Sequence, residues 1–331
     1  MADLKDKRIL MFSPFGSCTH YTIHIADELK RRGAEVRVYD ERPSQATMAK
    51  IYMYFFRNLA PQYFMNYIKK IVRETEGYNP DIVFVVRGQA FDVTTLTYMR
   101  SVYTNARFIF YQWDPLCGKR VKDILDMYDD AFSFDTDDVK NNPEFKFRPS
   151  LYLNEYLQVA NEKDRKYDVA FVGTLYNNRW PVIKRFMDYF DVHNMKSFFY
   201  LYMPSWTLYL WDFIRKGSFV SPNRMRFAPM TYLENVDIVK ESNCVLDIVY
   251  SKQTGLSMRA FESMAAKRKY ITNNAIVAEY DFYDPNNILI VDKDNINIPE
   301  DFVKSSFKEI DSTIMKKYSV EGFVNEIFQN A

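Results

Sequence analysis

The sequence predicts an α/β protein of two domains, each built around a parallel β-sheet. Short apolar runs alternate with helical patterns along the first half of the 331-residue chain, and the same alternation restarts in the second half. Polar stretches at residues 141–149 and 161–166 separate the halves and indicate a linker. Two successive βα arrays imply two Rossmann-like domains facing each other across a cleft, with ligands bound beyond the carboxyl ends of the strands.

The first half is expected to be doubly wound. A helix over about residues 20–32 ends at Gly33, and residues 47–76 also favour helix, interrupted near Pro61. The strands are short apolar runs of the kind found in parallel sheets buried on both faces, at residues 8–12, 36–39, 81–86, 107–111 and 131–134.

The second half repeats this order. A strand at 168–172 leads through a turn at Gly173 and Thr174 to a helix over 180–190, and another helix is expected over 231–241. The tail, residues 302–330, favours helix. The remaining strands are expected at residues 198–202, 244–249, 269–272 and 288–291.

Composition argues against several classes of protein. The chain has 44 basic and 43 acidic side chains, so its net charge of +1 does not favour binding to nucleic acid. Three scattered cysteines argue against a disulfide framework, and no Cys/His spacing resembles a zinc site. The first residues lack the apolar core of a signal peptide, and no apolar run is long enough for a membrane span. We therefore expect a cytoplasmic protein.

Aromatic residues make up 17% of the chain and gather at residues 51–71 and 198–213. Two interpretations stay open. Aromatic side chains pack well in cores, and large exposed apolar patches are uncommon on soluble proteins. Aromatic-rich helices flanked by basic residues also suit peripheral contact with a bilayer, here at the inner face of the cell membrane. The flanking basic residues are Lys69, Lys70, Arg215 and Lys216.

The most informative segment is residues 253–274, a polar loop followed by a short helix and a short strand. A loop that turns into a helix N-terminus, here at residues 255–258, offers free backbone N–H groups and a positive dipole end that suit a phosphate. Arg259 adds a cationic fork for phosphate oxygens. Glu262 projects beside it and can accept hydrogen bonds from sugar hydroxyls. We expect both side chains at the rim of the helix's apolar stripe, where they would bind a nucleotide.

This segment resembles the donor-binding motif of bacterial glycosyltransferases with the two-domain GT-B architecture, most closely the family-1-like group of capsule and lipopolysaccharide biosynthesis clusters. The resemblance extends over most of the chain. It includes Tyr-Asp-Glu-Arg-Pro at 39–43, Tyr-Gln-Trp-Asp-Pro at 111–115, Phe-Ser-Phe-Asp-Thr-Asp-Asp at 132–138, Tyr-Asp-Val-Ala-Phe-Val-Gly-Thr at 167–174 and Tyr-Asp-Phe-Tyr-Asp-Pro-Asn-Asn at 280–287.

The resemblance implies a division of labour along the chain. An N-terminal domain, residues 1–155, would bind the acceptor, and a second domain, residues 156–310, would bind a nucleotide-sugar donor. A helix over 311–331 would cross back to the first domain. The implied activity is transfer of a sugar from a UDP- or GDP-linked donor to a glycan or lipid-linked glycan in cell-surface polysaccharide synthesis.

Further donor contacts are expected where the first strand of the second domain ends. A glycine permits close backbone approach, a threonine hydroxyl can donate, and Arg179 can reach a diphosphate, although such a turn alone would be ordinary. The resemblance places this turn opposite the 255–262 loop and the nucleobase on the 227–229 loop. The expected donor-binding residues are Gly173, Thr174, Arg179, Phe227, Pro229, Gly255, Leu256, Ser257, Arg259 and Glu262.

Polar residues follow the strands of the first domain, where an acceptor and a catalytic group belong. An inverting enzyme needs a general base, and His20 or Asp114 can serve. The dipole at a helix start would lower the proton affinity of His20. A retaining enzyme needs no such base, so the stereochemical outcome stays open. The expected acceptor-binding residues are Ser17, Arg42, Arg87 and Gln89.

Two features bear on metal and activity. Asp135 and Asp137 superficially match the paired aspartates that hold a metal in single-domain glycosyltransferases, but their place before the linker favours loop and cap roles. The resemblance to GT-B enzymes implies that helix dipoles and basic side chains stabilise the leaving diphosphate, so we expect neither metal nor cofactor. Retaining members of the resembled superfamily carry two glutamates with seven residues between them across the donor loop, and Thr254 stands where the first would be. This departure keeps open a second hypothesis, a non-catalytic protein that binds a nucleotide sugar or glycan and partners a glycosyltransferase.

Overall fold

The structure is a computed structural model that describes residues 3–16, 18–44, 60–88, 91–116, 119–175, 179–216, 220–249 and 253–329. The chain divides into two compact units. Unit 1 comprises residues 1–150 and 320–331, and unit 2 comprises residues 151–319. The boundaries expected from the sequence fall after residues 155 and 310. Within the described residues, no helix is long and apolar enough to span a membrane.

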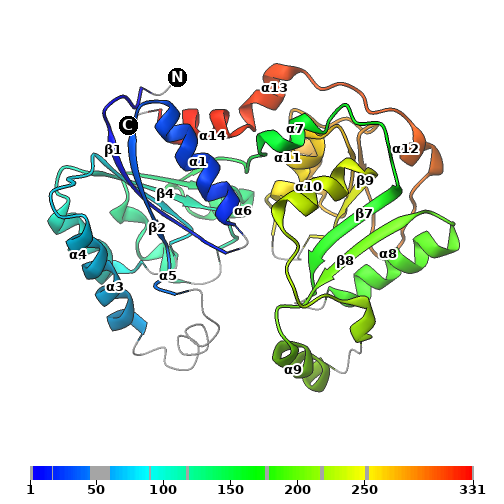
Figure 1. The fold of residues 1–331 in the computed structure, drawn as a ribbon, viewed down its shortest axis with the longest axis horizontal. Coiled ribbons are helices and arrows are strands. Elements are labelled where there is room, and N and C mark those ends of the chain that lie inside the picture. Colours follow the sequence, from blue (N-terminus) through cyan, green and yellow to red (C-terminus); the bar gives the residue numbers. More distant parts are fainter. Residues whose placement is uncertain are drawn as a thin grey trace. The chain divides into compact units, whose positions relative to one another are not determined.

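Unit 1 is built on a six-stranded, wholly parallel sheet with strand order β2-β1-β3-β4-β5-β6 (Figure 1). Its strands are β1 (Arg8–Ser13), β2 (Glu35–Asp40), β3 (Ile82–Val86), β4 (Arg107–Gln112), β5 (Asp130–Ser133) and β6 (Phe145–Phe147). Its helices are α1 (Thr19–Arg31), α3 (Ala60–Glu74), α4 (Val93–Val102), α5 (Lys119–Lys122), α6 (Thr136–Asn141) and α14 (Val320–Ile327), with a 3-10 helix at Leu125–Met127.

Most strands expected in this half are confirmed, and β6 corrects the linker prediction. The stretch 141–149 is polar, but Phe145 within it is buried and pairs with Ala131 of β5 in parallel register. A three-residue edge strand with a single buried residue has too few buried apolar side chains to stand out from a linker in the sequence.

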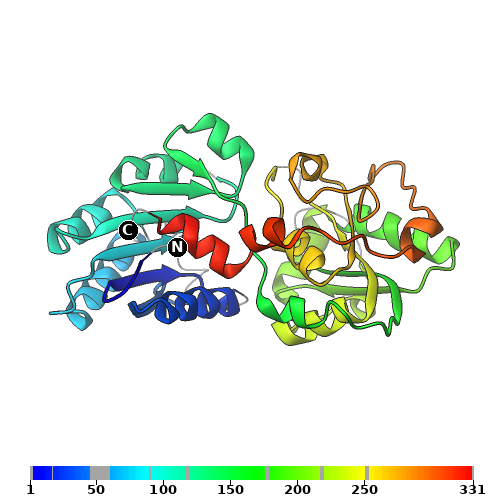
Figure 2. The same ribbon diagram turned by 90° about the horizontal axis from the view of Figure 1, so that it is seen from above.

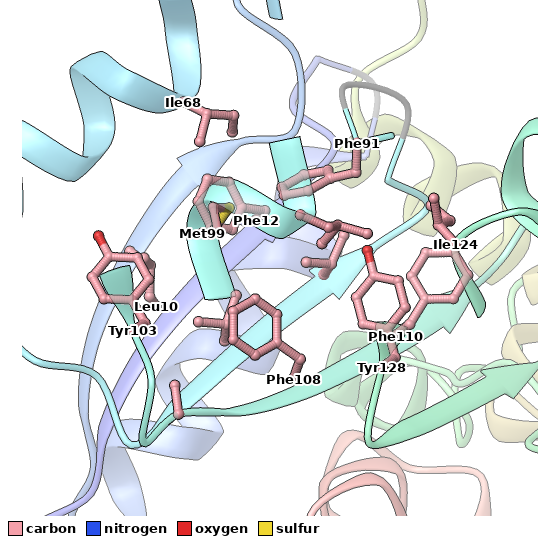
Figure 3. Packing of buried hydrophobic residues seen from close by; sticks show 14 of the residues in the cluster. Leu10, Phe12, Ile68, Phe91, Met99, Tyr103, Phe108, Phe110, Ile124 and Tyr128 are labelled. Atoms are coloured by element: carbon pink, nitrogen blue, oxygen red, sulfur yellow. The ribbon is translucent and has the colours of Figure 1, made fainter. Parts of the chain in front are cut away.

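Apolar side chains cover both faces of this sheet. On one face Phe12 and Phe110 pack with α3 and α4, and the rings of Phe12 and Phe91 meet edge to face at 5.1 Å (Figure 3). On the other face Phe84 meets Phe328 at 5.1 Å, just beyond the end of α14. The last helix therefore completes the core of unit 1, and α14 lies beside α1 (Figure 1).

The chain reaches α14 through two short helices instead of the continuous helix expected over 302–330. These are α12 (Glu300–Lys304) and α13 (Ser312–Lys317), and α14 alone belongs to unit 1 (Figure 2). Between them the side chain of Asn287 holds the backbone of Lys308, donating to its carbonyl (2.7 Å) and accepting from its N–H (2.8 Å). Those bonds replace the ones that a helix would make.

Unit 2 is built on a five-stranded parallel sheet with strand order β11-β10-β9-β7-β8. Its strands are β7 (Tyr167–Thr174), β8 (Ser197–Tyr202), β9 (Ser242–Asp247), β10 (Lys269–Thr272) and β11 (Ile288–Ile290). Besides α12 and α13, its helices are α7 (Asn154–Gln158), α8 (Trp180–Val192), α9 (Trp206–Lys216), α10 (Tyr232–Lys240) and α11 (Met258–Ala265), with 3-10 helices at Pro222–Arg224 and Ala275–Glu279.

Both sheets have one point at which the direction of chain winding reverses. In unit 2 the chain passes from β7 outward to β8 and then returns to β9 on the other side of β7. In unit 1 the corresponding reversal lies between β1 and β3. Loops diverge at such a switch point, and open α/β sheets bind their ligands there, beyond the carboxyl ends of the strands.

Candidate functional site

A buried aspartate marks the switch point of unit 2. Asp247 is the last residue of β9 and is only 2% exposed. Its Oδ1 accepts a hydrogen bond from Arg259 Nη1 (2.5 Å), and its Oδ2 accepts from the hydroxyls of Ser257 (2.6 Å) and Tyr270 (2.8 Å). Burial by itself raises the pKa of a carboxyl, but the Arg259 cation and the two hydroxyls outweigh burial and lower the pKa of Asp247. Asp247 is therefore held as an anion.

Arg259 joins the two strands of this switch point. It is the second residue of α11, and its Nη2 donates to the carbonyl oxygen of Val172 in β7 (2.5 Å) while its Nη1 bonds Asp247 in β9. Burial disfavours the charged guanidinium, yet the Asp247 carboxylate raises the pKa of Arg259. A quarter of the side chain (25%) is exposed. A fixed cation is thus accessible at the edge where a ligand is expected.

Arg179 approaches the same edge from β7. It precedes α8 as the N-cap residue, and its Nη2 donates to the carbonyl oxygen of Ile248, the residue after β9. Its cation also favours the ionised form of Asp247. Two arginines therefore converge on the carboxyl end of β9, next to Gly173 and Thr174 at the end of β7.

Gly173 has a packing role besides the close backbone approach expected from the sequence. A Cβ atom at this position would lie 2.6 Å from the ring of Phe171, closer than side chains tolerate. The Phe171 ring in turn lies 5.9 Å from the guanidinium carbon of Arg259. Gly173 therefore leaves space for the aromatic ring over which the Arg259 cation lies.

The loop before α11 is fixed by side-chain contacts to its backbone. Asn274 Nδ2 donates to the carbonyl of Thr254 (3.1 Å), Gln253 Nε2 donates to that of Gly255 (2.9 Å), and Leu256 is buried. Ser257 is the N-cap residue of α11, but its hydroxyl bonds Asp247 and makes no cap hydrogen bond. The Ser257 side chain thus leaves the first-turn amide groups of α11 to other acceptors.

Glu262 lies deeper than the rim position expected for it. The residue is 6% exposed, because α7 packs against α11 and brings Tyr156 onto Glu262. The hydroxyl of Tyr156 in α7 donates to Glu262 and accepts from Asn235 Nδ2 (2.8 Å). The expectation of a rim position therefore fits Arg259 and is wrong for Glu262.

The loop expected to hold a nucleobase presents an aromatic pair. Phe227 stacks on Trp206 of α9, with ring centroids 4.3 Å apart and an interplanar angle of 17°. The hydroxyl of Tyr200 donates to the carbonyl of Ala228 (2.9 Å), and Pro229 is exposed. One face of Phe227 is thus occupied by Trp206, so a base would meet the pair and not Phe227 alone.

In unit 1 a buried glutamate lies one strand away from the switch point, at the carboxyl end of β2. Glu41 follows β2 and is fully buried, and its Oε1 accepts from Nε (2.7 Å) and Nη2 of Arg87. Arg87 follows β3 with a left-handed φ of 65°, and its Nη1 lies 3.6 Å from Asp114 Oδ2. Arg87 was expected to bind the acceptor, and the structure places it between two carboxylates.

Asp114 is the most exposed of the three charged residues Glu41, Arg87 and Asp114. Just over half of its side chain (54%) is accessible. Partial burial raises the pKa of Asp114, although the cations of Arg87 and Arg42 oppose that shift. An accessible carboxylate with a raised pKa is suited to accept a proton.

The remaining residues expected in unit 1 lie around this cluster or outside the described residues. Arg42 Nε is 3.7 Å from Glu41 Oε1. His20 is the second residue of α1, where its carbonyl oxygen accepts from His24 Nδ1 (2.7 Å). Ser17 and Gln89 fall outside the residues that the structure describes.

Within the described ranges, no group of three or more His, Cys, Asp or Glu side chains is arranged to hold a metal ion. Asp135 accepts hydrogen bonds from the backbone N–H groups of Asp137 and Asp138 as the N-cap of α6. The cap role expected for Asp135 is confirmed.

Sequence reasoning missed three residues of these clusters. Asp247 and Glu41 each come at or just after the end of an apolar strand. Asp114 was predicted from the same signal, so the sequence was sufficient to predict Asp247 and Glu41 as well. Tyr156 carries no such signal, because only the fold brings it to Glu262.

Comparison with known proteins shows which fold this architecture belongs to. No family model and no curated protein matches the chain. A glycosyltransferase from Rickettsia africae is 14% identical, with a TM-score of 0.59 over 98% of this chain and 100% of that one. The lipopolysaccharide outer core galactosyltransferase WaaB is 15% identical, with a TM-score of 0.51 over 98% and 100%. The chain has the GT-B fold.

The GT-B fold is not confined to one activity. A UDP-GlcNAc 2-epimerase from Neisseria meningitidis, bound to UDP-GlcNAc, is 12% identical to this chain, with a TM-score of 0.51 over 97% and 98% of the two chains. Identities this low establish the architecture alone, so the activity must be argued from the site.

Proposed function

We propose that this protein is a metal-independent glycosyltransferase that moves a sugar from a UDP- or GDP-linked donor to a glycan or lipid-linked glycan acceptor in cell-surface polysaccharide synthesis. The observation that carries the proposal is the Asp247–Arg259 pair, which fixes a cation across β7 and β9 at the switch point. The likeness to a glycosyltransferase and to a lipopolysaccharide galactosyltransferase supports it.

The proposed donor site depends on positive charge at the carboxyl end of β9. When the bond between the sugar and the diphosphate breaks, negative charge grows on the leaving diphosphate. Arg259, Arg179 and the first-turn amides of α11 are already oriented toward that edge, so they stabilise the charge without reorganising. The base would stack near Trp206 and Phe227.

The acceptor half rests on Asp114. In an inverting reaction the acceptor oxygen attacks the anomeric carbon, its proton passes to the Asp114 carboxylate, and the nucleoside diphosphate leaves. His20 is the alternative base. In a retaining reaction the donor's own phosphate takes that proton.

The direct test is product release. The protein is incubated with a panel of nucleotide sugars, and free UDP, GDP and CMP are measured. We expect release from one donor class and about a hundredfold weaker nucleotide binding in Arg259→Ala, because a charge-assisted fork is lost. Absence of any release, together with no rise in melting temperature on adding nucleoside diphosphates, contradicts the proposal.

The same panel separates two other functions. An epimerase, as one structural neighbour is, would change the sugar while the nucleotide stays attached, which NMR of the sugar protons detects. A non-catalytic partner would bind a nucleotide sugar and leave it intact.

We extend the proposal to peripheral contact with the membrane, where a lipid-linked acceptor would lie. Helix α9 exposes Trp206 (56%), Leu210 (55%) and Ile214 (73%), which recur at helical spacing on one face. Such a face suits the bilayer interface. We expect co-sedimentation with phosphatidylglycerol vesicles to fall in Leu210→Ser/Ile214→Ser, which leaves the Trp206–Phe227 pair intact. It should persist in Leu233→Ser, an exposed leucine of α10. Equal loss in both variants contradicts the assignment.

A further inference from the structure

The loop that carries Asp114 is anchored on both sides by buried polar side chains of unit 1. Gln112, the last residue of β4, donates through Nε2 to the carbonyl oxygen of Asp114 (2.6 Å). Asp138 of α6 accepts from the backbone N–H of Leu116, which lies 3.0 Å from Oδ2 and 3.3 Å from Oδ1. Both bonds hold backbone atoms, so they fix the loop and leave the Asp114 carboxylate accessible.

The Gln112 side chain is only partly satisfied by this arrangement. Within the part of the chain that the structure describes, its buried Oε1 accepts no hydrogen bond. A buried amide oxygen without a donor costs more free energy than one neutral hydrogen bond contributes. An apolar side chain of the same length would therefore stabilise unit 1 better, and the amide is explained by its bond to Asp114 and not by stability.

Asp138 also costs stability at neutral pH. Burial raises the pKa of its carboxyl to about 6, and the carboxylates of Asp135 and Asp137 at the start of α6 add to that shift. The Leu116 N–H and the Ser133 hydroxyl oppose the shift without cancelling it. Since this pKa lies above the ordinary value, ionisation of Asp138 disfavours folding. The ionised carboxylate in return makes the bond to Leu116 charge-assisted, and so stronger than a neutral one.

We propose that Gln112 and Asp138 are positioning residues that hold the 113–116 loop so that Asp114 can take the proton of the acceptor hydroxyl. The inference rests on the proposed function, since it requires Asp114 to be the general base. Arg87 Nη1 lies 3.6 Å from the Asp114 carboxylate and would draw a freely moving carboxylate toward itself. A general base must stay within hydrogen-bond reach of the proton that it abstracts, and a loop held on both sides keeps it there.

The first test is Gln112→Met in the full chain, which keeps the length of the side chain and removes the amide. We expect kcat for release of UDP or GDP to fall about tenfold to a hundredfold, because the base is no longer held in place. The Kd for UDP or GDP should stay unchanged, and the melting temperature should not fall, because the unsatisfied amide oxygen is gone.

The pH profile of the same variant separates positioning from support of the fold. Partial burial raises the pKa of Asp114, and release of the loop exposes the carboxyl. The acid limb of kcat/KM should therefore move to lower pH in Gln112→Met, toward the ordinary carboxyl pKa. A residue that only supports the fold would lower the melting temperature and leave that limb in place.

Asp138 gives a second pair of variants, which decides the question if Gln112→Met does not fold. Asp138→Asn keeps an oxygen for the Leu116 N–H, so we expect kcat within about threefold of the wild type. Asp138→Ala removes the anchor and should lose as much as Gln112→Met. Asn142→Ala is the matched control, because Asn142 is also buried and donates to the Asp138 carbonyl (2.7 Å), so kcat should stay at the wild-type value.

The outcomes separate the inference from the proposed function. Wild-type kcat with an unshifted acid limb, in either Gln112→Met or Asp138→Ala, overturns the inference and leaves the glycosyltransferase in place. Full activity in Asp114→Asn does the same, because the base is then another group. An equal loss of kcat in Asn142→Ala shows a structural role alone and also overturns the inference. Absence of UDP or GDP release by the wild type from every donor tested overturns both.

Discussion

The switch points of the two units use the same pair of side-chain types in different ways. In unit 2 the buried carboxylate of Asp247 holds Arg259, and in unit 1 the buried carboxylate of Glu41 holds Arg87. Both carboxylates lie at the carboxyl end of a parallel strand or directly after it. In each unit an arginine is therefore fixed in place by the protein itself.

The two arginines differ in the second group that each of them contacts. Arg259 turns its second Nη to the carbonyl of Val172, whereas Arg87 turns its own toward the carboxylate of Asp114. The pKa of Asp247 is lowered and that of Asp114 is raised. The same device thus leaves a fixed charge in unit 2 and an accessible carboxylate in unit 1, which suits the binding and proton-transfer roles proposed for them.

The largest expected effect tests the unit 1 side of this comparison. Asp114→Asn should lower kcat/KM by about a hundredfold to ten-thousandfold, the usual worth of a general base, while the Kd for the nucleoside diphosphate stays unchanged. Steady-state kinetics and calorimetric titration measure the two quantities. His20→Gln is the companion variant: if it, and not Asp114→Asn, removes activity, the base is His20.

The next effect compares the two buried carboxylates by stability. Asp247→Asn leaves the Arg259 cation, three-quarters of whose side chain is covered, without its anion, and we expect it to lower the free energy of unfolding by about 3–5 kcal/mol. Glu41→Gln should cost less, because Asp114 remains near Arg87. Urea unfolding followed by tryptophan fluorescence measures both. Equal losses would mean that Asp114 does not share the charge of Arg87.

Mild acid should separate the two carboxylates further. The pKa of Asp114 lies above 3.8, so its ionised form is lost first as the pH falls, and kcat/KM should drop about tenfold per pH unit below that pKa. The pKa of Asp247 lies below 3.8, so its stabilising contribution is present above 3.8 and lost only as the pH falls through the lower value. Nucleotide affinity measured over the same range should therefore persist where turnover has already declined.

The sequence could predict the parts of this comparison that depend on local pattern. Apolar runs located β3 and β4, and helical spacing located α1 and α8, because each element carries its own burial period. Arg259 stood out as a cation at a helix start next to an apolar stripe. Position along the chain was enough for these features.

Contacts between distant segments could not be predicted in the same way. Glu262 is buried because α7 packs against α11, and the sequence of α11 alone does not show that another helix packs there. The role of Arg87 depends on Glu41, which lies on a different strand connection. Strand β6 was missed because an edge strand of three residues has almost no burial pattern of its own.

The smallest expected effect compares two glycines near the carboxyl ends of central strands, Gly173 in β7 and Gly88 after β3. Gly173→Ala should cost about 1–3 kcal/mol, because the new Cβ overlaps the ring of Phe171. Gly88→Ala should cost a similar amount for a different reason: Gly88 has a φ of +69°, which disfavours any side chain, and its Cβ would also lie 3.0 Å from Phe110.

A second substitution distinguishes these causes. Adding Phe171→Leu to Gly173→Ala removes the overlap, so the double variant should lose less stability than the sum of the single changes. Adding Phe110→Leu to Gly88→Ala leaves the backbone strain in place, so the two losses should be more nearly additive. Chemical unfolding of the four single and two double variants gives both cycles. Additivity in the Phe171 cycle would mean that the ring moves freely, and that Gly173 is needed for the approach of a ligand to the backbone and not for packing.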